Sequence, residues 1–212
     1  MILAEFRLLL SIRERPLTMK RFFVLWLKRL ITFPKLILLL SRSEWLRFRG
    51  AQIGKLAVVG KTNMQGNLNN LYIGTGASIG ECTFILHDKI QIQSYAVVSD
   101  GVTILTASHQ LRSSKWASVK KPIFIGKHAW IAVNSLLLPG VSIGAGAVVG
   151  AGSVVRENVP DFALAAGNPA TIVVEKRNSN LCYYPSLLNA PLEAWVGANI
   201  NSKIKDLFEC EI

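Results

Sequence analysis

Aliphatic residues recur at every sixth position across the centre of the chain. Between residues 125 and 155 the series is unbroken and consists of Ile125, Ile131, Leu137, Ile143, Val149 and Val155. The residue after each of these is usually small, and a second small or β-branched residue follows four positions on. Helices repeat every 3.6 residues and single strands every two, so neither explains a strict period of six. A fixed short repeat of this kind is the signature of a β-helix.

In a β-helix, each hexapeptide forms one short strand and one turn. We expect the aliphatic residue to point into a prism, where it stacks on its equivalent in the next coil, while the small residues allow tight turns. Three faces close a coil of about 18 residues, and stacked coils rise by about 4.8 Å each. The alternative is a Gly-rich parallel sheet in an α/β protein. That fold requires helices between strands, and residues 123–158 leave no room for them.

The repeat is less regular before this stretch. It starts near Ile53, is interrupted at residues 67–70 and shifts its frame by one at residues 87–89. A polar, basic stretch at residues 106–122 breaks it for longer, and we expect a loop that leaves the coil there. Such a loop inside a strict repeat is more often functional than not. Pro160 has no amide hydrogen to donate, so it is predicted to end the ladder of strands.

These patterns divide the chain into three parts. Residues 1–50 form a basic, amphipathic helical segment, residues 51–160 the β-helix, and residues 161–212 a turn and a cap with short helices over the end or side of the prism. In the first part, an apolar run over residues 22–40 is interrupted by charged residues and by Pro34. Because proline disrupts a helix interior, we expect two short helices on either side of it.

Positive charge is concentrated in the N-terminal segment. The chain of 212 residues has a net charge of +11, and residues 1–50 carry eleven Lys and Arg against three Glu. These charges argue against a membrane-spanning helix, and the lack of a small-residue cleavage site argues against a signal peptide. Two interpretations stay open: the segment lies on an anionic membrane surface, or it packs on the β-helix or on a neighbouring subunit. No nucleic-acid-binding motif accompanies the charge, so no nucleic-acid partner is expected.

The three cysteines, Cys82, Cys182 and Cys210, are odd in number and far apart in the sequence. They suggest neither a disulfide framework nor a zinc cluster. The simplest inference is a reducing, cytoplasmic location. If the N-terminal segment contacts lipid, we expect the protein to associate peripherally with the surface of the inner membrane.

Two stretches carry a resemblance to a known family. Residues 125–170 read IGKHAWIAVNSLLLPGVSIGAGAVVGAGSVVRENVPDFALAAGNPA, which resembles the hexapeptide-repeat acyltransferases. Residues 98–111 read VSDGVTILTASHQL, which resembles the active-site segment of the same family. Both look most like acetyltransferases of bacterial polysaccharide biosynthesis. The resemblance covers roughly residues 50–175. It implies a mainly β fold, a left-handed parallel β-helix that forms a homotrimer, and acetyl transfer from acetyl-CoA to a sugar hydroxyl.

The implied reaction needs a general base, because an alcohol must lose its proton as it attacks the thioester. Histidine has a pKa suited to that task near neutrality. By the resemblance, His109 falls at the family's catalytic position, whereas His128 is expected in a surface turn. Asp88 and Asp100 are the candidates to orient the base or to bind acceptor hydroxyls. Trp130 matches a family tryptophan that lines the pocket beside the catalytic histidine of the next subunit. No covalent enzyme intermediate is expected.

The resemblance also implies where acetyl-CoA binds. In the family, backbone groups hold the pantetheine arm in a groove between two prisms, and the adenine end lies near the Gly-Asn-Pro-Ala turn. By position, the corresponding residues here are Ala132, Val133, Gly150, Ala151, Arg156, Glu157 and Gly167. No metal ion is implied. Many relatives carry Lys or Arg just after that turn, where this chain has Thr171 and Val174. Gln110 replaces an acidic residue often found after the catalytic histidine.

Other functions stay open at this point. The acceptor could be an amino sugar, serine or an antibiotic, or a lipid-linked sugar, which would explain the basic N-terminus. Zinc hydratases that resemble γ-class carbonic anhydrase share the fold but need three histidines brought together. Here the loop at residues 106–122 shifts the register between His109 and His128. A third alternative is a non-catalytic trimeric scaffold at the membrane, which would have no use for His109.

Overall fold

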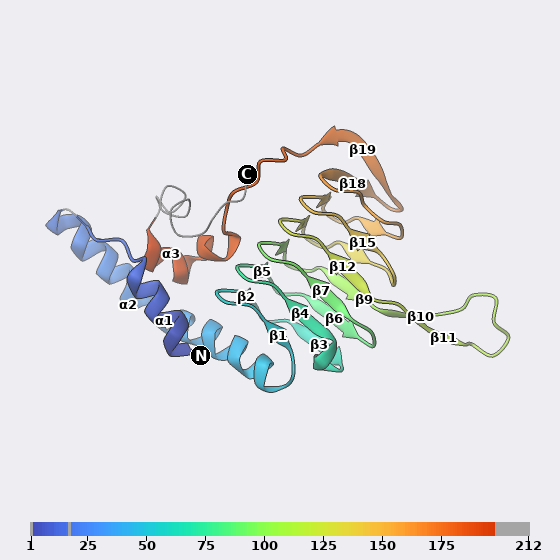
Figure 1. Ribbon diagram of the computed structural model, residues 1–212, viewed down its shortest axis with the longest axis horizontal. Coiled ribbons are helices and arrows are strands. Elements are labelled where there is room, and N and C mark those ends of the chain that lie inside the picture. Colours follow the sequence, from blue (N-terminus) through green and yellow to red (C-terminus); the bar gives the residue numbers. More distant parts are fainter. Residues whose placement is uncertain (1, 17, 198–212) are drawn as a thin grey trace.

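The computed structural model describes residues 2–16 and 18–197, and its centre is a three-sided parallel β-helix (Figure 1). Face A consists of β1 (Gln52–Ile53), β4 (Leu71–Ile73), β7 (Ile90–Ile92), β12 (Ile123–Ile125) and β15 (Ser142–Ile143). Face B consists of β2 (Val58–Val59), β5 (Ser78–Ile79), β8 (Val97–Val98), β13 (Trp130–Ile131), β16 (Val148–Val149) and β18 (Ala163–Gly167). Face C consists of β3 (Asn63–Gly66), β6 (Thr83–Leu86), β9 (Thr103–Leu105), β14 (Leu136–Leu137) and β17 (Val154–Val155). The predicted left-handed parallel β-helix is confirmed.

The aliphatic residues of the six-residue repeat fill the interior of the prism. All six between residues 125 and 155 are buried, with at most 1% of any of them exposed. Their coils stack in register, so that Ile125 pairs with Ile143, 18 residues on. In the first coils the same step takes 19 residues, from Ser78 to Val97, or 20, from Val58 to Ser78. A short helix, η1 (Leu68–Asn70), takes up some of these extra residues. This is why the repeat looks irregular in the first half of the chain.

Stacked turns form the edges of the prism, and two edges matter for function. The BC edge joins faces B and C and contains Lys61, Glu81, Asp100, Val133 and Ala151, one in each coil. The CA edge joins faces C and A and contains residues 87–89, 106–122 and 156–158. Backbone hydrogen bonds connect successive turns, as where the Asn134 amide donates to the Asp100 carbonyl at 3.0 Å. Side chains from different coils therefore line up along each edge.

A hairpin leaves the CA edge between β9 and β12. It pairs β10 (Ala107–His109) with β11 (Ser118–Lys120) in antiparallel register, and His109 lies opposite Ser118. In Figure 1 this hairpin projects from the prism on the side opposite to the helices. The polar stretch of residues 106–122 is therefore an arm that extends beyond its own prism.

Two helices precede the prism, α1 (Ile2–Ser11) and α2 (Met19–Phe48). The prediction of two short helices on either side of Pro34 is wrong, because α2 continues through this proline. An interior proline removes one backbone hydrogen bond and costs about 3 kcal/mol. Leu36 and Leu40, which follow it, are buried in one apolar cluster with Leu56 and Val58 of the first coil. This tertiary packing stabilises the helix beyond Pro34, as is common for helices in proteins.

A group of charged residues attaches the C-terminal end of α2 to the first coil. Arg47 donates to the carbonyls of Ile53 at 3.0 Å and Gly54 at 2.9 Å. The same guanidinium pairs with Glu44 at 2.7 Å and with Glu5 of α1 at 2.9 Å. Because Glu5 is only 4% exposed, its charge needs this compensation. Both N-terminal helices are thereby fixed to the prism.

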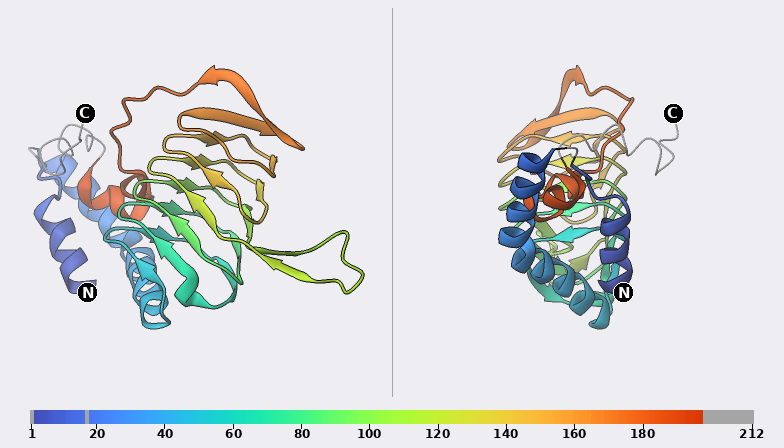
Figure 2. Two further views of the ribbon diagram at one scale, coloured as in Figure 1. Left: turned by 45° about the vertical axis from the view of Figure 1, so that its right-hand side comes forward. Right: turned by 90° about the vertical axis from the view of Figure 1, so that its left-hand side faces the viewer.

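The C-terminal part closes the prism and then returns to the helices. β18 and β19 (Ala170–Lys176) form an antiparallel hairpin. The prediction that Pro160 ends the ladder is wrong, because β18 pairs beside β16, and Pro160 lies in a turn where no ladder hydrogen bond is needed. The chain then runs back to η2 (Pro185–Leu188) and α3 (Ala190–Val196), which pack with α1 and α2 (Figure 2). Residues 198–212 of the predicted cap lie outside the described residues.

Cys182 is disulfide-bonded, which the wide spacing of the cysteines did not predict. Separation in sequence says little about separation in space in a chain that folds back on itself. Cys82 is a buried free thiol, and Cys210 lies outside the described residues. In the part of the chain that the structure describes, none of the helices is both long and apolar enough to cross a membrane.

Candidate functional site

His109 is the last residue of β10, where the loop of the hairpin begins, and it is exposed to solvent. Trp116 of this loop fixes the orientation of its ring. Its Nδ1 atom is 2.8 Å from the carbonyl oxygen of Trp116, and its ring stacks on the Trp116 indole at 4.6 Å and 19°. A carbonyl oxygen only accepts hydrogen bonds, so Nδ1 carries the proton. In the neutral ring the lone pair is therefore on Nε2, which is the tautomer that a general base needs.

The loop of the hairpin positions this carbonyl. The Gln110 amide donates to the Ala117 carbonyl at 2.8 Å, and the Trp116 amide donates to the Ser113 carbonyl at 3.2 Å. Ser113 Oγ accepts from the Ala117 amide at 3.2 Å. Trp116 adopts a φ of 51°, which is uncommon for a residue other than glycine. These contacts turn the Trp116 carbonyl towards His109. Sequence reasoning missed this partner, since a backbone carbonyl leaves no mark on residue type.

Asp88 lies on the CA edge, one coil before the base of the hairpin. Its amide donates to Oγ1 of the buried Thr106 at 3.0 Å, and its carboxylate accepts from the Lys89 amide at 2.7 Å. Within the described residues, its carboxylate makes no hydrogen bond to His109. The structure thus places Asp88 beside the root of the arm but gives it no orienting contact with the base in a single chain.

Asp100 and Trp130 lie together, but on a different side of the prism from His109. Asp100 is on the BC edge, where its Oδ1 accepts from the Glu81 amide at 2.8 Å. Trp130 is on face B, 43% exposed, and its Nε1–H donates to Ser99 Oγ at 3.3 Å. The hairpin with His109 leaves from the CA edge. One chain therefore brings Asp100 and Trp130 together and keeps His109 apart from them.

Four of the residues expected to bind acetyl-CoA follow the BC edge above Asp100. These are Ala132, Val133, Gly150 and Ala151. Ala132 is buried, whereas Val133 and Ala151 are exposed. Ser135 Oγ lies within hydrogen-bond distance of the carbonyls of Ala132, at 2.8 Å, and Gly150, at 3.0 Å, which fixes the two turns relative to each other. The small side chains leave the backbone of this strip accessible to a thin, extended ligand.

Arg156 and Glu157 lie on the CA edge of the last full coil. Together with Pro169 and Thr171, they line a pocket of about 220 Å³. Gly167, the remaining expected residue, is exposed, and its amide donates to Ser153 Oγ at 3.1 Å. The residues expected to hold acetyl-CoA are thus divided between two edges of one prism.

His128 is buried, so the prediction that it lies at the surface is wrong. It is 9% exposed, between the rings of Tyr95 at 5.0 Å and Tyr183 at 4.9 Å. Burial is the main cause that lowers the pKa of His128 to about 4, and the charges of Lys127 and Arg177 add to it. The returning C-terminal segment, which carries Tyr183, covers this turn. A repeat pattern does not reveal such a cover, because the segment lies about 50 residues away in sequence.

Cys82 is poorly suited to act as a nucleophile. Burial, together with the neighbouring charge of Asp100, raises the pKa of its thiol to about 12. The thiolate, which is the reactive form, is therefore scarce near neutral pH. Among the described residues, no three His, Cys, Asp or Glu side chains lie close enough together to hold a metal ion.

Similarity to known proteins identifies the family. A family model described as "Bacterial transferase hexapeptide (six repeats)" matches residues 122–157. The chain is 33% identical over 136 residues to "Putative colanic acid biosynthesis acetyltransferase WcaF" of Escherichia coli (strain K12), which covers 64% of this chain and 75% of WcaF.

Two solved structures share the fold. A maltose O-acetyltransferase from Clostridium difficile 630 has a TM-score of 0.59 at 28% identity, covering 65% of this chain and 75% of that one. A hexapeptide-repeat acetyltransferase from Vibrio cholerae O1 biovar eltor, in complex with acetyl-CoA, has a TM-score of 0.62 at 24% identity, covering 82% and 99%. The chain belongs to the hexapeptide-repeat acetyltransferases, and it is an acyltransferase.

Proposed function

We propose that this acetyltransferase moves an acetyl group from acetyl-CoA to a sugar hydroxyl during assembly of a bacterial cell-surface polysaccharide. The observation that carries the proposal is the contact of His109 Nδ1 with the Trp116 carbonyl, which in the neutral ring leaves the lone pair on Nε2. The similarity to WcaF, named for colanic acid biosynthesis, and to a maltose O-acetyltransferase supports a carbohydrate acceptor.

In the proposed reaction, Nε2 of His109 removes the proton of the acceptor hydroxyl as its oxygen attacks the thioester carbonyl. The C–O bond forms, the C–S bond breaks, and the CoA thiolate takes the proton back from the imidazolium. The Trp116 carbonyl holds the ring in place and stabilises its positive charge, as a carboxylate does in other enzymes. The reaction needs no covalent acetyl-enzyme intermediate, which agrees with the high pKa of the Cys82 thiol.

The complete site requires a second copy of the chain, and we propose a homotrimer. The CA edge carries His109, Asp88, Arg156 and Glu157, and the BC edge carries Asp100 and the small-residue strip. A cyclic assembly joins two different surfaces of the same chain at every interface. Three prisms in which the CA edge faces the BC edge of the next copy would bring His109 to Trp130 and would unite the two halves of the acetyl-CoA site.

We further propose that the protein works at the cytoplasmic surface of the inner membrane, on an acceptor that is itself lipid-linked. The support is the surface of the N-terminal helices. Large apolar side chains of α2 are exposed beside Lys and Arg residues, a combination that suits an anionic lipid surface.

A thiol-release assay tests the proposed function. Purified protein and acetyl-CoA are mixed with a panel of sugars, sugar nucleotides and lipid-linked oligosaccharides, with His109→Ala as the control. We expect acceptor-dependent release of CoA that disappears in the variant. Saturable binding of acetyl-CoA without release would mean that the donor is right and the acceptor is missing from the panel. If neither binding nor release occurs, the protein acts as a scaffold rather than as an enzyme.

A further inference from the structure

Helix α2 has two apolar faces, and only one of them packs on the protein. The other leaves large side chains exposed at a spacing of three, four, seven or eight residues, which places them on one side of the helix. Its members are Phe23, Leu27, Leu30, Leu38, Trp45 and Phe48, and each is at least 53% exposed. We call this set the α2 stripe. Soluble proteins rarely leave a continuous apolar surface of this kind without a partner.

A groove beside the α2 stripe is lined by cations from two parts of the chain. Lys35 and Arg42 of α2 lie seven residues apart on one flank of the helix, and Lys61 comes from the BC edge of the prism. The groove has a volume of about 770 Å³ and also includes Leu38 and Trp45 of the stripe. Within the described residues, none of the three cations has an acidic partner at ion-pair distance. The lining also includes Glu81, so the groove offers a net positive charge next to apolar surface.

The groove adjoins the residues expected to bind the acceptor. Glu81, the acidic residue of its lining, donates its backbone amide to Asp100 Oδ1 at 2.8 Å. Asp100 adjoins Ser99, whose hydroxyl accepts from Trp130. Lys61 and Asp100 are two coils apart on the BC edge, which corresponds to about 10 Å at the spacing of neighbouring strands. A ligand held by its head in the groove could thus extend a sugar along the edge to Asp100.

We propose that this groove binds the phosphate group that joins the acceptor sugar to its lipid, while the lipid chain lies along the α2 stripe. This rests on the proposed transfer to a sugar. Lys and Arg provide charge-assisted hydrogen bonds to phosphate oxygens, with Arg able to bind two at once. The apolar chain would bury the stripe, and removal of apolar surface from water would favour binding. The N-terminal helices then position the substrate instead of serving only as a membrane anchor.

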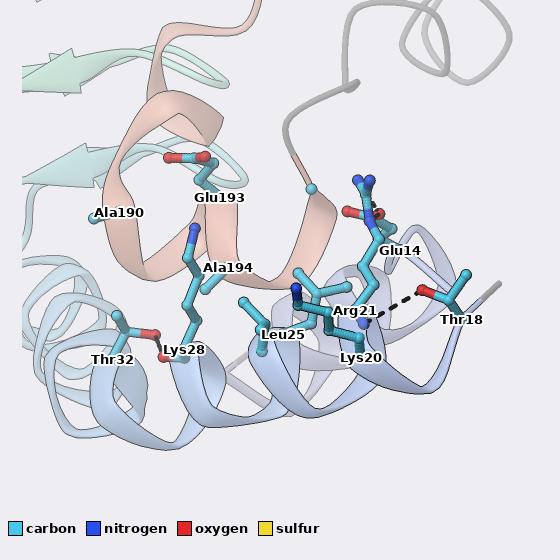
Figure 3. Close-up of a pocket in the computed structure, with 12 residues that line it drawn as sticks. Glu14, Thr18, Lys20, Arg21, Leu25, Lys28, Thr32, Ala190, Glu193 and Ala194 are labelled. Carbon is cyan, nitrogen blue, oxygen red and sulfur yellow. Dashed lines mark hydrogen bonds and ion pairs between the residues drawn. The ribbon is translucent and has the colours of Figure 1, made fainter. Parts of the chain in front are cut away.

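The same helix supplies a matched control. Lys20 and Lys28 also belong to α2 but line a different cavity, of about 550 Å³, between α2 and α3 (Figure 3). That cavity contains the carboxylates of Glu14 and Glu193, and Glu14 pairs with Arg21. Replacing Lys20 and Lys28 by Gln removes two charges from α2, as does replacing Lys35 and Arg42. Only the second pair belongs to the groove.

The experiment compares two acceptors with the same sugar, one free and one joined through a diphosphate to a lipid in neutral vesicles. For Lys35→Gln/Arg42→Gln, and separately for Lys61→Gln in its exposed turn, we expect KM for the lipid-linked acceptor to rise about tenfold, as charge-assisted contacts are lost. KM for acetyl-CoA and for the free sugar should stay unchanged. Lys20→Gln/Lys28→Gln should behave like the unmodified protein. An equal rise in both double variants would indicate general attraction to the membrane and would overturn the proposal.

A binding measurement keeps this inference separate from the proposed reaction. The full chain is titrated with a fluorescent lipid diphosphate that carries no sugar, so no catalysis is needed. We expect binding that weakens about tenfold in Lys35→Gln/Arg42→Gln and remains in His109→Ala, which keeps all groove residues. Equal affinity of the protein and the groove variants would disprove the site even if acetyl transfer is observed. Equal competition by phosphatidylglycerol vesicles would assign the groove to a bilayer lipid and would also overturn the proposal.

Discussion

At the residue scale, the proposed chemistry depends on which nitrogen of His109 carries a proton. A backbone carbonyl rather than a carboxylate sets this, because Nδ1 lies 2.8 Å from the Trp116 oxygen. A neutral partner stabilises an imidazolium less than a carboxylate does. The orientation of the His109 ring therefore depends on its stacking with Trp116 and on the tight loop that positions the Trp116 carbonyl.

Removal of the base should abolish most of the activity. We expect His109→Ala to lower kcat by about 10² to 10⁴, with little change in KM for acetyl-CoA, as is typical for the loss of a general base. The residue is exposed, so the melting temperature should barely change. His87→Ala, an exposed histidine on the same edge, is the matched control and should keep full activity. A His109→Ala protein that retains its rate would contradict the mechanism.

His128 should make the protein less stable in mild acid. Its pKa is about 4 in the folded state, below the ordinary value of 6.5, so the unfolded chain binds more protons between these two pH values. The free energy of unfolding should therefore fall as the pH drops from 6.5 towards 4, by roughly 1 to 3 kcal/mol in total. Urea unfolding at pH 7 and at pH 4.5 measures this loss.

The variant His128→Asn isolates this contribution from that of the carboxylates. Asparagine tolerates the positive φ of 58° at this position better than most residues do. The variant should lose less stability than the unmodified protein over the same pH range. Identical pH dependence in the two proteins would mean that burial does not lower the pKa of His128 in the folded state.

The role of a single residue could be predicted where the six-residue repeat or a family motif indicated it. The inward positions, such as Ile143, followed from the period of six. The expected roles of His109 and Trp130 came from a family resemblance, and their direct test is still the activity assay. The Trp116 carbonyl and the burial of His128 were beyond sequence reasoning, because the first involves backbone and the second a cover made by a distant segment.

At the element scale, each coil is a thin layer that is stable only between its neighbours. Strands of two residues, such as β15, have almost no stability of their own, so stacking in register supplies it. The same dependence on tertiary contacts explains α2. Its helical course through Pro34 contradicts local propensity, but one of its faces is held by the first coil. Local rules predicted the coils well because the repeat itself encodes the contact between neighbours, and they failed at α2 because its contacts are not periodic.

A charge placed inside the prism tests this account of stacking. Ile143 is fully buried and pairs with Ile125 of the preceding coil. We expect Ile143→Asp to lower the free energy of unfolding by about 4 kcal/mol or more, since an unpaired charge would be buried. Ser142→Asp, one position away and partly exposed, should cost far less. Thermal unfolding of both variants makes the comparison, and similar melting temperatures would show that the inward register is wrong.

At the scale of the whole molecule, the distribution of the expected site residues is the main finding. The arm with His109 leaves one edge of the prism, while Asp100, Trp130 and the small-residue strip belong to another region. The N-terminal helices pack on the first coils and bring the cationic groove to the BC edge. If copies associate edge to edge, each interface would contain a complete site, with a base, an acceptor site and the small-residue strip for acetyl-CoA.

Mixing two inactive variants tests whether the site is shared between copies. His109→Ala damages the arm and Trp130→Ala damages face B, so a trimer of either variant alone should be nearly inactive. After unfolding and refolding together in equal amounts, an interface is intact when the arm comes from the Trp130→Ala chain and the pocket from the His109→Ala chain. Random cyclic assembly produces this combination at about one interface in four, so about a quarter of the activity should return. Mixing without exchange of subunits is the control and should restore none. If refolded mixtures stay inactive while size measurements confirm mixed trimers, each chain must hold its own complete site, and the hairpin would then have to fold back onto its own prism.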